Sequence, residues 1–277
     1  MRRLVRATAA GRAGYGLIVL GALLAMIPFA WEISTAFKTL GESVQAPPVL
    51  VPEHANWHNF TTVFENAPFA RQFANTVVVS VGRVAGQLLL CSVAAYAFAR
   101  LDFPGRHVLF GLFLSVLMVP SQLFIIPQYR IMQELGWLNT LQALILPGIF
   151  SAFGTFMLRQ FFLGLPAELD EAAELDGCNP LQKYWLIYLP LARPGLIALG
   201  VLTLLWSWND LLWPLVVNTD PQQMTLSAGL ASLKGQYLTD FPVLMAGAVM
   251  ATLPMIAVFA LLQRHVVEGV ATTGAKG

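Results

Sequence analysis

Five carboxylates occur within nine positions of the segment Pro166–Pro190, which reads PAELDEAAELDGCNPLQKYWLIYLP. They are Glu168, Asp170, Glu171, Glu174 and Asp176. Clustered acids can act in general acid–base catalysis or bind a cation, but either use needs converging partner groups. The segment contains no histidine and no metal-ligand motif. We therefore interpret the five acids as a solvated or docking face and not as a catalytic centre.

Local signals in this segment predict a first helix from about Pro166 to Asp176. Proline suits the first turn, where its missing N–H has no partner to lose. Acids in that turn favour the positive end of the helix dipole. Gly177 suits the left-handed position that ends a helix. One side of this helix is small and largely apolar, so that a partner could approach closely: Leu165, Leu169, Ala172, Ala173 and Asp176.

A second short helix is predicted to follow, with Asn179 as its N-cap and Pro180 in its first turn. Apolar residues then recur with helical spacing and predict an apolar stripe: Leu181, Tyr184, Trp185 and Tyr188. Pro190 ends or redirects this helix. From the residues alone, the segment is either an amphipathic hairpin on the inner membrane surface or an ordered docking element.

A second polar patch, WSWNDLLWP, lies within an apolar stretch at Trp206–Pro214. Asn209 and Asp210 offer hydrogen-bonding groups, and the neighbouring tryptophans offer aromatic faces. This combination suits a sugar, which presents apolar C–H faces and many hydroxyl groups. The alternative interpretation is an interfacial aromatic belt with a capping acid.

Arg83 lies inside the apolar segment Phe73–Ala99. A charge at that depth normally faces protein or a water-filled cavity. Because Arg83 and Asp210 both fall in the outer halves of their apolar segments, we predict that they pair. The candidates for a transport path are therefore Asn209, Asp210, Trp208 and Arg83.

Other chemistries have weaker support. His54 and His58 have the spacing of two helical metal ligands, but the Glu of HExxH is missing and Pro52 favours a plain loop, so we expect no metal site. No lysine follows a glycine, which excludes ATP binding through a Gly-Lys-Ser/Thr phosphate loop. Cys91 and Cys178 fall in an apolar span and in the polar segment, and we do not expect them to form a disulfide.

The composition indicates a polytopic membrane protein. The 277 residues are 57% hydrophobic and 11% charged, whereas soluble proteins average about 25% charged residues. The net charge of +1 gives no reason to expect nucleic acid as a partner.

Six apolar stretches are long enough to cross a bilayer, which takes about 20 residues. We place them at residues 13–37, 73–99, 108–132, 140–163, 191–217 and 243–266. Arginine or lysine occurs at the N-terminus and in every short connection that alternation places inside, so both termini are predicted to be cytoplasmic. The predicted fold class is thus all-α integral membrane, with six transmembrane helices.

The resulting organisation has four parts. Residues 1–37 hold the cytoplasmic N-terminus and the first transmembrane helix, and 38–72 form an outer loop. Residues 73–266 form a core of five helices that includes the cytoplasmic loop 164–190, and 267–277 form a cytoplasmic tail. No repeat and no inverted pairing of halves is visible in the sequence.

The polar segment resembles the EAA loop of binding-protein-dependent ABC importer permeases, whose usual form is EAA, three residues, G, nine residues and I-x-L-P. Here the spacing is the same and involves Glu171, Ala172, Ala173, Gly177, Ile187, Leu189 and Pro190. Other stretches are similar to the carbohydrate-uptake branch, the maltose-type second permease subunit. They are AAYAFARLDFPGR (94–106), MVPSQLFIIPQY (118–129), GWLNTLQALILPG (136–148), SWNDLLWPL (207–215) and the ending EGVATTGAKG.

This resemblance covers the chain from about Phe73 onward and implies a type I ABC importer permease fold. In that family the EAA loop forms coupling helices that sit in a cleft on the ATP-binding subunit. It therefore implies ATPase-coupling roles for Glu171, Ala172, Ala173, Asp176, Gly177, Ile187, Leu189 and Pro190. Glu171 would face a basic group, and Gly177 would allow the bend. ATP and Mg would be bound by the partner ATPase, so the chain needs no cofactor and is not itself an enzyme.

The resemblance also implies partners and a location. The chain would pair with a second permease subunit as a heterodimer, with two ATP-binding subunits and with an extracytoplasmic solute-binding protein, in a bacterial or archaeal inner membrane. In maltose-type permeases an outer loop reaches into the binding protein. The loop Asn218–Pro242, with Gly235, Gln236 and Tyr237, is therefore a candidate contact, and a simple connection is the alternative. The expected function is the transmembrane path for a sugar or related polyol.

Two other function classes compete with this expectation. An ion-coupled secondary carrier of a small polar solute would want ionisable groups near mid-membrane and, usually, internal repeats. The sequence offers mainly Arg83 and Asp210, and its ordered polar segment has no use in a carrier that works alone. An intramembrane enzyme would need a paired catalytic constellation, which we do not find in the sequence.

Overall fold

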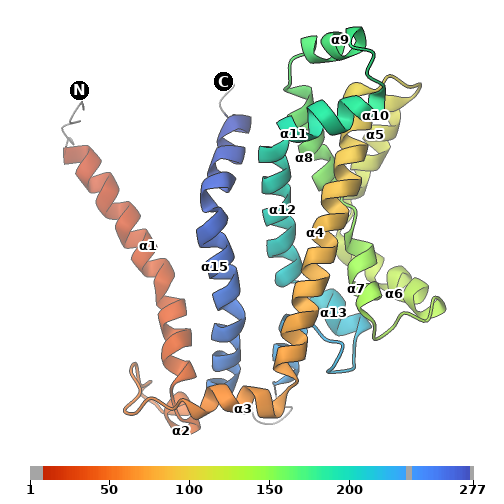
Figure 1. Cartoon of the computed structure of the whole chain (residues 1–277). Coiled ribbons are helices and arrows are strands. Elements are labelled where there is room, and N and C mark those ends of the chain that lie inside the picture. The colour runs from red at the N-terminus through yellow and green to blue at the C-terminus, as the bar shows by residue number, and fades with distance from the viewer. Residues whose placement is uncertain (1–8, 235–238, 275–277) are drawn as a thin grey trace. The chain divides into compact units, whose positions relative to one another are not determined.

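The structure, a computed structural model, describes residues 9–234 and 239–274 (Figure 1). All regular secondary structure in these two ranges is helical. The chain divides into unit 1, residues 1–67 with 232–253, and unit 2, residues 68–231 with 254–277. The last helix, α15 (Phe241–Gly274), contributes its first part to unit 1 and its remainder to unit 2.

Four helical segments are long and apolar enough to cross a membrane: Gly14–Ala36, Phe69–Arg100, Leu141–Leu163 and Phe241–Leu261. Two further pairs of helices meet the same criteria only when each pair is taken together. Arg106–Met118 and Ser121–Glu134 are bent by 94°, and Pro180–Leu191 and Arg193–Trp208 by 75°. The described residues thus provide four to six candidate spans, where six were predicted.

Unit 1 contains two short helices in the segment that was predicted to be an outer loop. Thr39 and Glu42 form a reciprocal capping box, which satisfies N–H groups that have no partner within the helix. The backbone N–H of Thr39 donates to the Glu42 carboxylate and is the main cause of the lowered pKa of that carboxyl. Asn59 donates its side-chain amide to the carbonyl oxygens of Ala36 and Lys38, both at 2.8 Å. Unit 1 begins with α1 (Ala9–Ala36), α2 (Leu40–Val44) and α3 (His58–Asn66).

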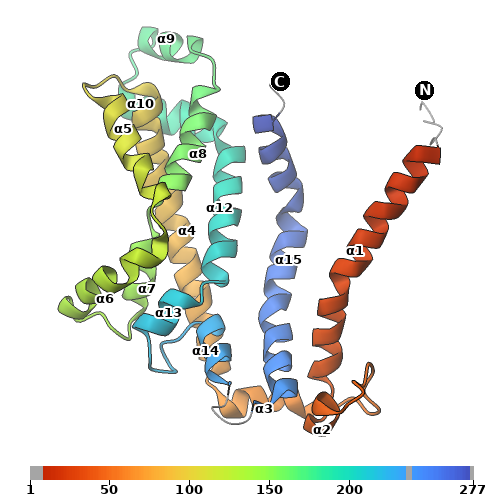
Figure 2. The same ribbon diagram turned by 180° about the vertical axis from the view of Figure 1, so that it is seen from behind.

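Unit 2 is built around α4 (Phe69–Arg100), a helix of 32 residues. Two other helices, α8 (Ala152–Leu163) and α12 (Arg193–Trp208), pack along α4 and against each other (Figure 1). The remaining helices of unit 2 are α5 (Arg106–Ser115), η1 (Val116–Met118), η2 (Ser121–Phe124), α6 (Ile125–Glu134), α7 (Leu141–Ile145), η3 (Leu146–Gly148), α9 (Glu168–Leu175), α10 (Pro180–Lys183), η4 (Tyr184–Tyr188), α11 (Leu189–Leu191), α13 (Leu212–Val217) and α14 (Leu226–Ser232). Within unit 2, α9 lies at one end of α4, and α13 lies toward the other (Figure 2).

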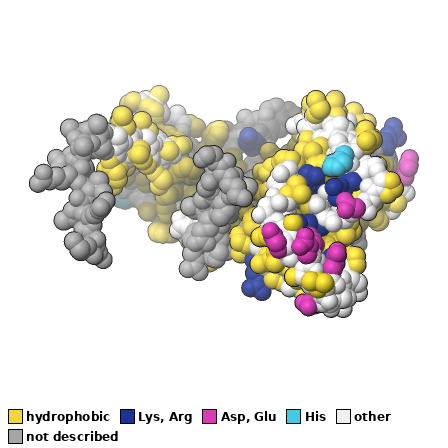
Figure 3. Space-filling model, turned by 90° about the horizontal axis from the view of Figure 1, so that it is seen from above, with side chains coloured by type: hydrophobic (Ala, Val, Ile, Leu, Met, Phe, Trp, Pro, Cys, Tyr) yellow, Lys and Arg dark blue, Asp and Glu magenta, His cyan; other side chains and the backbone are white. Residues whose placement is uncertain are grey.

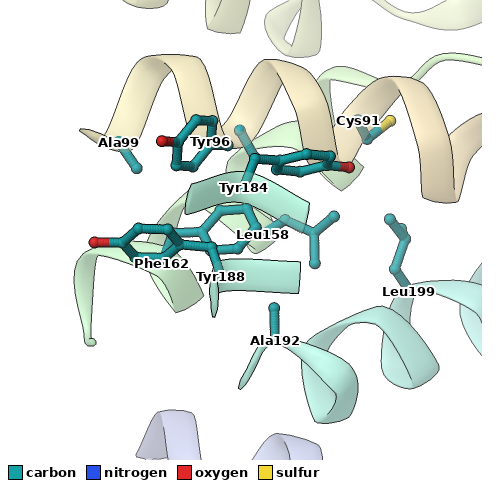
Figure 4. Close-up of a cluster of buried hydrophobic side chains, with 10 residues drawn as sticks. Cys91, Tyr96, Ala99, Leu158, Phe162, Tyr184, Tyr188, Ala192 and Leu199 are labelled. Atoms are coloured by element: carbon teal, nitrogen blue, oxygen red, sulfur yellow. The ribbon is translucent and has the colours of Figure 1, made fainter. Parts of the chain in front are cut away.

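A buried cluster joins α4, α8, η4 and the start of α12 (Figure 4). Tyr96, Phe162 and Tyr188 form its aromatic centre, with ring centroids 5.3 to 6.2 Å apart in tilted or edge-on arrangements. The other members are Cys91, Ala95, Ala99, Leu158, Tyr184, Ala192 and Leu199. The cluster fixes η4, which lies in the second half of the polar segment, against the helix bundle.

The third predicted span, residues 108–132, is not one continuous helix. The chain leaves the helical conformation at Val119, turns at Pro120 and becomes helical again with η2 at Ser121, which leads into α6 at Ile125. Proline disfavours the helical conformation of the residue before it, which explains the break. Pro127 does not interrupt the chain, because it lies in the first turn of α6, where its missing N–H costs nothing.

The fifth predicted span, residues 191–217, is also divided. α12 ends at Trp208, and α13 begins only at Leu212. Asn209 donates its side-chain amide to the carbonyl oxygen of Leu205 at 2.8 Å and so caps the end of α12. Asn and Asp compete with the helix for backbone hydrogen bonds, so Asn209-Asp210 is a natural place for the helix to stop.

α4 and the chain before α8 approach each other closely at Gly86. A Cβ atom at this position would lie 2.5 Å from the Cβ atom of Ile149, which is well inside van der Waals contact. Gly86 is therefore required by packing, and not by backbone conformation.

We predict that Gly86→Ala destabilises the purified chain by about 1–3 kcal/mol, the usual cost of overpacking. Gly111→Ala is the matched control, because no atom lies within 4 Å of the added methyl group in α5. Thermal unfolding of both variants in detergent measures the difference. Equal melting temperatures for the two variants would contradict the close approach.

Candidate functional site

The predicted first helix of the polar segment is present as α9, Glu168–Leu175. Gly177 has φ 76°, which confirms the predicted left-handed ending. The N–H of Cys178 donates to the carbonyl oxygen of Ala173 at 2.9 Å, and that of Gly177 to Glu174 at 3.0 Å. This pair of bonds is a Schellman motif, which satisfies the last carbonyl groups of the helix.

The predicted second helix begins as expected, with Asn179 as N-cap and Pro180 in the first turn of α10. Asn179 and Gln182 form a capping box. After Lys183 the chain continues as a π-helix, in which the N–H of Leu189 donates to the carbonyl oxygen of Tyr184.

The residues of the predicted apolar stripe do not share one buried face. Tyr184 and Tyr188 are buried, but Leu181 is 66% exposed and Trp185 is 49% exposed. Tyr184 and Tyr188 pack into the buried cluster with α4 and α8, and Leu181 and Trp185 remain on the surface of the chain.

Two cations that were not predicted as site residues, Arg100 and Lys183, hold α9 in place. Arg100, the last residue of α4, forms an ion pair with Asp170 at 3.1 Å and donates to the carbonyl oxygens of Phe162 and Leu165 at 2.6 and 2.7 Å. Lys183, also buried, forms an ion pair with Glu174 at 2.8 Å. Arg100 directly follows the apolar segment 73–99, and five acids follow later in the chain at residues 168–176. These two features are the sequence signal that could have suggested an ion pair between Arg100 and this cluster.

The outward side of α9 is free of such contacts. Glu171, Ala172 and Asp176 are exposed, and the side chain of Leu175 is 90% exposed. Seen from this end, acidic and basic side chains gather beside one another among hydrophobic ones (Figure 3). Of the three EAA residues, Ala173 alone is buried. The polar segment therefore presents an ordered acidic and apolar surface, as a docking element would.

The predicted pairing of Arg83 with Asp210 is confirmed, with Nη1 2.8 Å from Oδ2. Arg83 also donates from Nε to the carbonyl oxygen of Leu144 at 2.8 Å. The pair lies on the wall of a cavity of about 520 Å³. The polar residues on this wall are Arg83, Ser121, Gln122, Gln128, Asn209 and Asp210.

A second, smaller cavity of about 230 Å³ shares Arg83, Gly148 and Asp210 with the first. Gln87 extends its polar lining, since it donates to the carbonyl oxygen of Gly148 at 2.9 Å and accepts from Thr203 at 2.8 Å. The two cavities together form a polar strip between α4, the η3 break and the α12–α13 break.

Trp208 has a different position from the other path candidates. It is buried, packs edge-on against Phe73 with ring centroids 5.8 Å apart, and lines neither of these cavities. Trp206, half-exposed beside Phe153, lines the smaller cavity. A hollow of about 530 Å³ at residues 102–108 is lined by a single surface turn, so we do not assign it to the path.

The base of the predicted outer loop, Asn218–Pro242, is tied to α4. Asn75 donates to the carbonyl oxygens of Gln222 and Met224 at 2.8 and 2.9 Å, and Thr76 accepts from the N–H of Leu226 at 2.8 Å. Asn139 accepts from two backbone N–H groups of the same loop. The predicted binding-protein contacts Gly235, Gln236 and Tyr237 lie outside the described residues.

Residues 87–272 match the family described as binding-protein-dependent transport system inner membrane component. The chain belongs to this family. It is therefore a multi-pass permease component of a bacterial inner-membrane transport system, in agreement with its apolar helices.

Relatives match over most of their length. The arabinooligosaccharides transport system permease protein AraQ of Halalkalibacterium halodurans is 37% identical, over 92% of this chain and 93% of that protein. The diacetylchitobiose uptake system permease protein NgcG of Streptomyces coelicolor is 32% identical, over 92% and 86%. The sn-glycerol-3-phosphate transport system permease protein UgpE of Yersinia enterocolitica is 32% identical, over 91% and 93%.

Among solved structures, a chain of a bacterial ABC transporter involved in the import of the acidic polysaccharide alginate is similar. The TM-score is 0.81 at 24% identity, over 95% of this chain and 98% of that chain. A chain of an alginate ABC transporter in complex with a pentasaccharide-bound periplasmic protein has a TM-score of 0.67 at 14% identity, over 96% and 99%. These likenesses show a shared fold.

We predict that Arg83→Ala and Asp210→Ala each lower stability and assembly, and that the double variant loses less than the sum of the two. Each single change leaves one charge unpaired beside the cavity, so a coupling of about 1–3 kcal/mol is expected. Thermal unfolding and the yield of assembled complex, compared across the four forms, measure it. Additive losses would show that the pair contributes no interaction energy.

Proposed function

We propose that this chain is the permease subunit of an ATP-driven importer and forms half of a transmembrane path for a sugar or related polyol. The observation that carries the proposal is the ordered α9–Gly177–α10 segment, whose outward face is exposed while its inward face is held by ion pairs. Such a surface is suited to receive a rigid partner, and family membership supports an ATPase as that partner.

In this proposal α9 lies on the cytoplasmic side and docks into a cleft of an ATP-binding subunit. Glu171 faces a basic group there, Ala172 allows close approach, and Asp176 borders the same surface. Gly177 sets the angle between the two helices. Ala173, Ile187 and Leu189 act from within, since Ala173 is buried and the other two are half-buried. Pro190 is exposed and redirects the chain ahead of α12.

We propose the assembly because this chain alone encloses only part of a transmembrane path. The cavities of this chain are open, so we infer that a second permease subunit closes the path from the opposite side as a heterodimer. Two ATP-binding subunits supply ATP and Mg, and an extracytoplasmic binding protein delivers the solute to the outer loops. In this arrangement the two bent helix pairs each count as one span, which gives six spans with both termini cytoplasmic.

The proposed substrate class rests on the cavity and on the relatives. Relatives named for arabinooligosaccharides and diacetylchitobiose import carbohydrates. The cavity wall combines amide and hydroxyl groups with an ion pair whose charges offset each other. Such a wall offers many hydrogen bonds and little net charge, which favours an uncharged polyhydroxylated solute over an ion.

We predict that Glu171→Lys leaves the chain in the membrane but detaches or uncouples the ATPase, because the reversed charge would face a basic group on that subunit. Glu134→Lys makes the same charge reversal at an exposed position of α6 and is expected to have no such effect. Co-purification of the ATPase and ATP-driven uptake measure the outcome. Normal uptake with Glu171→Lys would refute the docking role.

A second prediction concerns the energy source. Vesicles that contain the chain with its second permease, ATPases and binding protein should import the solute only when ATP is supplied. Vesicles that contain the chain alone, with a proton or sodium gradient, should import none. Uptake by the chain alone would favour an ion-coupled carrier and overturn the proposal.

A further inference from the structure

α9 has little apolar packing of its own. Of its eight residues only Ala173 is buried, and the acids of its first turn point toward water or toward cations. A short helix with one buried side chain gains little from burial, and an isolated helix of this length is unstable in water. Some other interaction must therefore hold α9 in a fixed orientation.

That interaction is a set of four charged side chains, Arg100, Asp170, Glu174 and Lys183, which we call the α9 anchor. Asp170 lies between the two cations, 3.1 Å from Arg100 and 3.9 Å from Lys183. Glu174, one turn later on α9, is 2.8 Å from Lys183. Acids at positions i and i+4 of one helix are thus held by cations from two other elements.

The cations are the fixed half of the anchor. The side chains of Arg100 and Lys183 are only 10% and 9% exposed. Arg100 stacks over the ring of Tyr188, with its guanidinium carbon 4.9 Å from the ring centroid. It also donates to two carbonyl oxygens at the end of α8, so one guanidinium touches α4, α8, α9 and η4. Such multiple bonds give Arg a single well-defined position.

We infer that Arg100 and Lys183 are positioning residues for energy coupling, which bind Asp170 and Glu174 so that a push on α9 moves α4 and α8. Without them the push would be absorbed by bending of the flanking loops. This inference rests on the proposed function, because it assumes that a partner acts on α9. It assigns a role to the inward acids of α9, distinct from the docking role of Glu171.

The test uses the full importer, with its second permease, ATPase subunits and binding protein, in proteoliposomes. Uptake of solute and hydrolysis of ATP are measured in the same vesicles. Asp170→Asn preserves the shape of the side chain and removes its charge. We expect solute imported per ATP hydrolysed to fall about tenfold, the scale of one charge-assisted hydrogen bond. ATP hydrolysis and ATPase co-purification should stay within about twofold of the unchanged importer.

Two further variants separate this role from a general structural one. Asp170→Glu keeps the charge and should restore at least half of the import per ATP. Asp102→Asn breaks another carboxylate–arginine pair, Asp102 with Arg106 at 2.9 Å, which does not involve α9, and should leave the ratio unchanged. Normal import per ATP in Asp170→Asn, or loss of the ATPase subunits from it, would overturn the inference.

A transport-independent measurement keeps the anchor testable if no solute is imported by the unchanged protein. A spin label at Leu175→Cys, in a Cys178→Ser background, reports on an exposed position of α9. Asp170→Asn should increase the mobility of this label, and Asp102→Asn should not. Equal mobility of the label in the two variants would overturn the inference that the α9 anchor holds α9. Absence of ATP-driven uptake in the unchanged importer would overturn the proposed function alone.

Discussion

The fold of unit 2 depends on hydrogen bonds to backbone carbonyl groups at an interruption within the apolar span Leu141–Leu163. The break between α7 and α8 leaves carbonyl groups without helical partners, and lipid cannot supply hydrogen bonds. Three long polar side chains do so instead: Trp213 donates to Ala143, Arg83 to Leu144 and Gln87 to Gly148, at 2.8 to 2.9 Å. Arg83 and Gln87 also line the cavities, so the polar strip and the integrity of the fold rest on the same groups.

Local signals predicted local features well. Gly177 ends α9 in the left-handed conformation and Asn179 caps the next helix, because both effects act within a few residues of the chain. The Arg83–Asp210 pair was also predictable, since few partners exist for a charge at that depth. Pro190 was predicted to end or redirect its helix, and the chain bends by 75° just after it. The sizes of the two bends, 94° and 75°, and the π-helix were not predictable, because packing between distant segments, and not local propensity, decides them.

The same limit explains the missed residues of the site. Arg100 and Lys183 were read from sequence only as charges that mark a side of the membrane. Their partners lie 70 and 9 residues away in the chain, and periodicity gives no information on such contacts. α4 carries both Arg83 and Arg100, which are about 25 Å apart at 1.5 Å per residue. One rigid helix thus bears a residue of the cavity wall and a residue of the α9 anchor.

The exposure of α9 separates substitutions that the fold tolerates from those that it does not. Glu171, Ala172 and Leu175 support no side chain behind them, so they can change without opening a void or leaving a buried charge unpaired. The inward acids are not free in this way. In the proposed assembly, a change on the outward face of α9 would therefore alter docking to the ATP-binding subunit while the packing of the helix bundle stays the same.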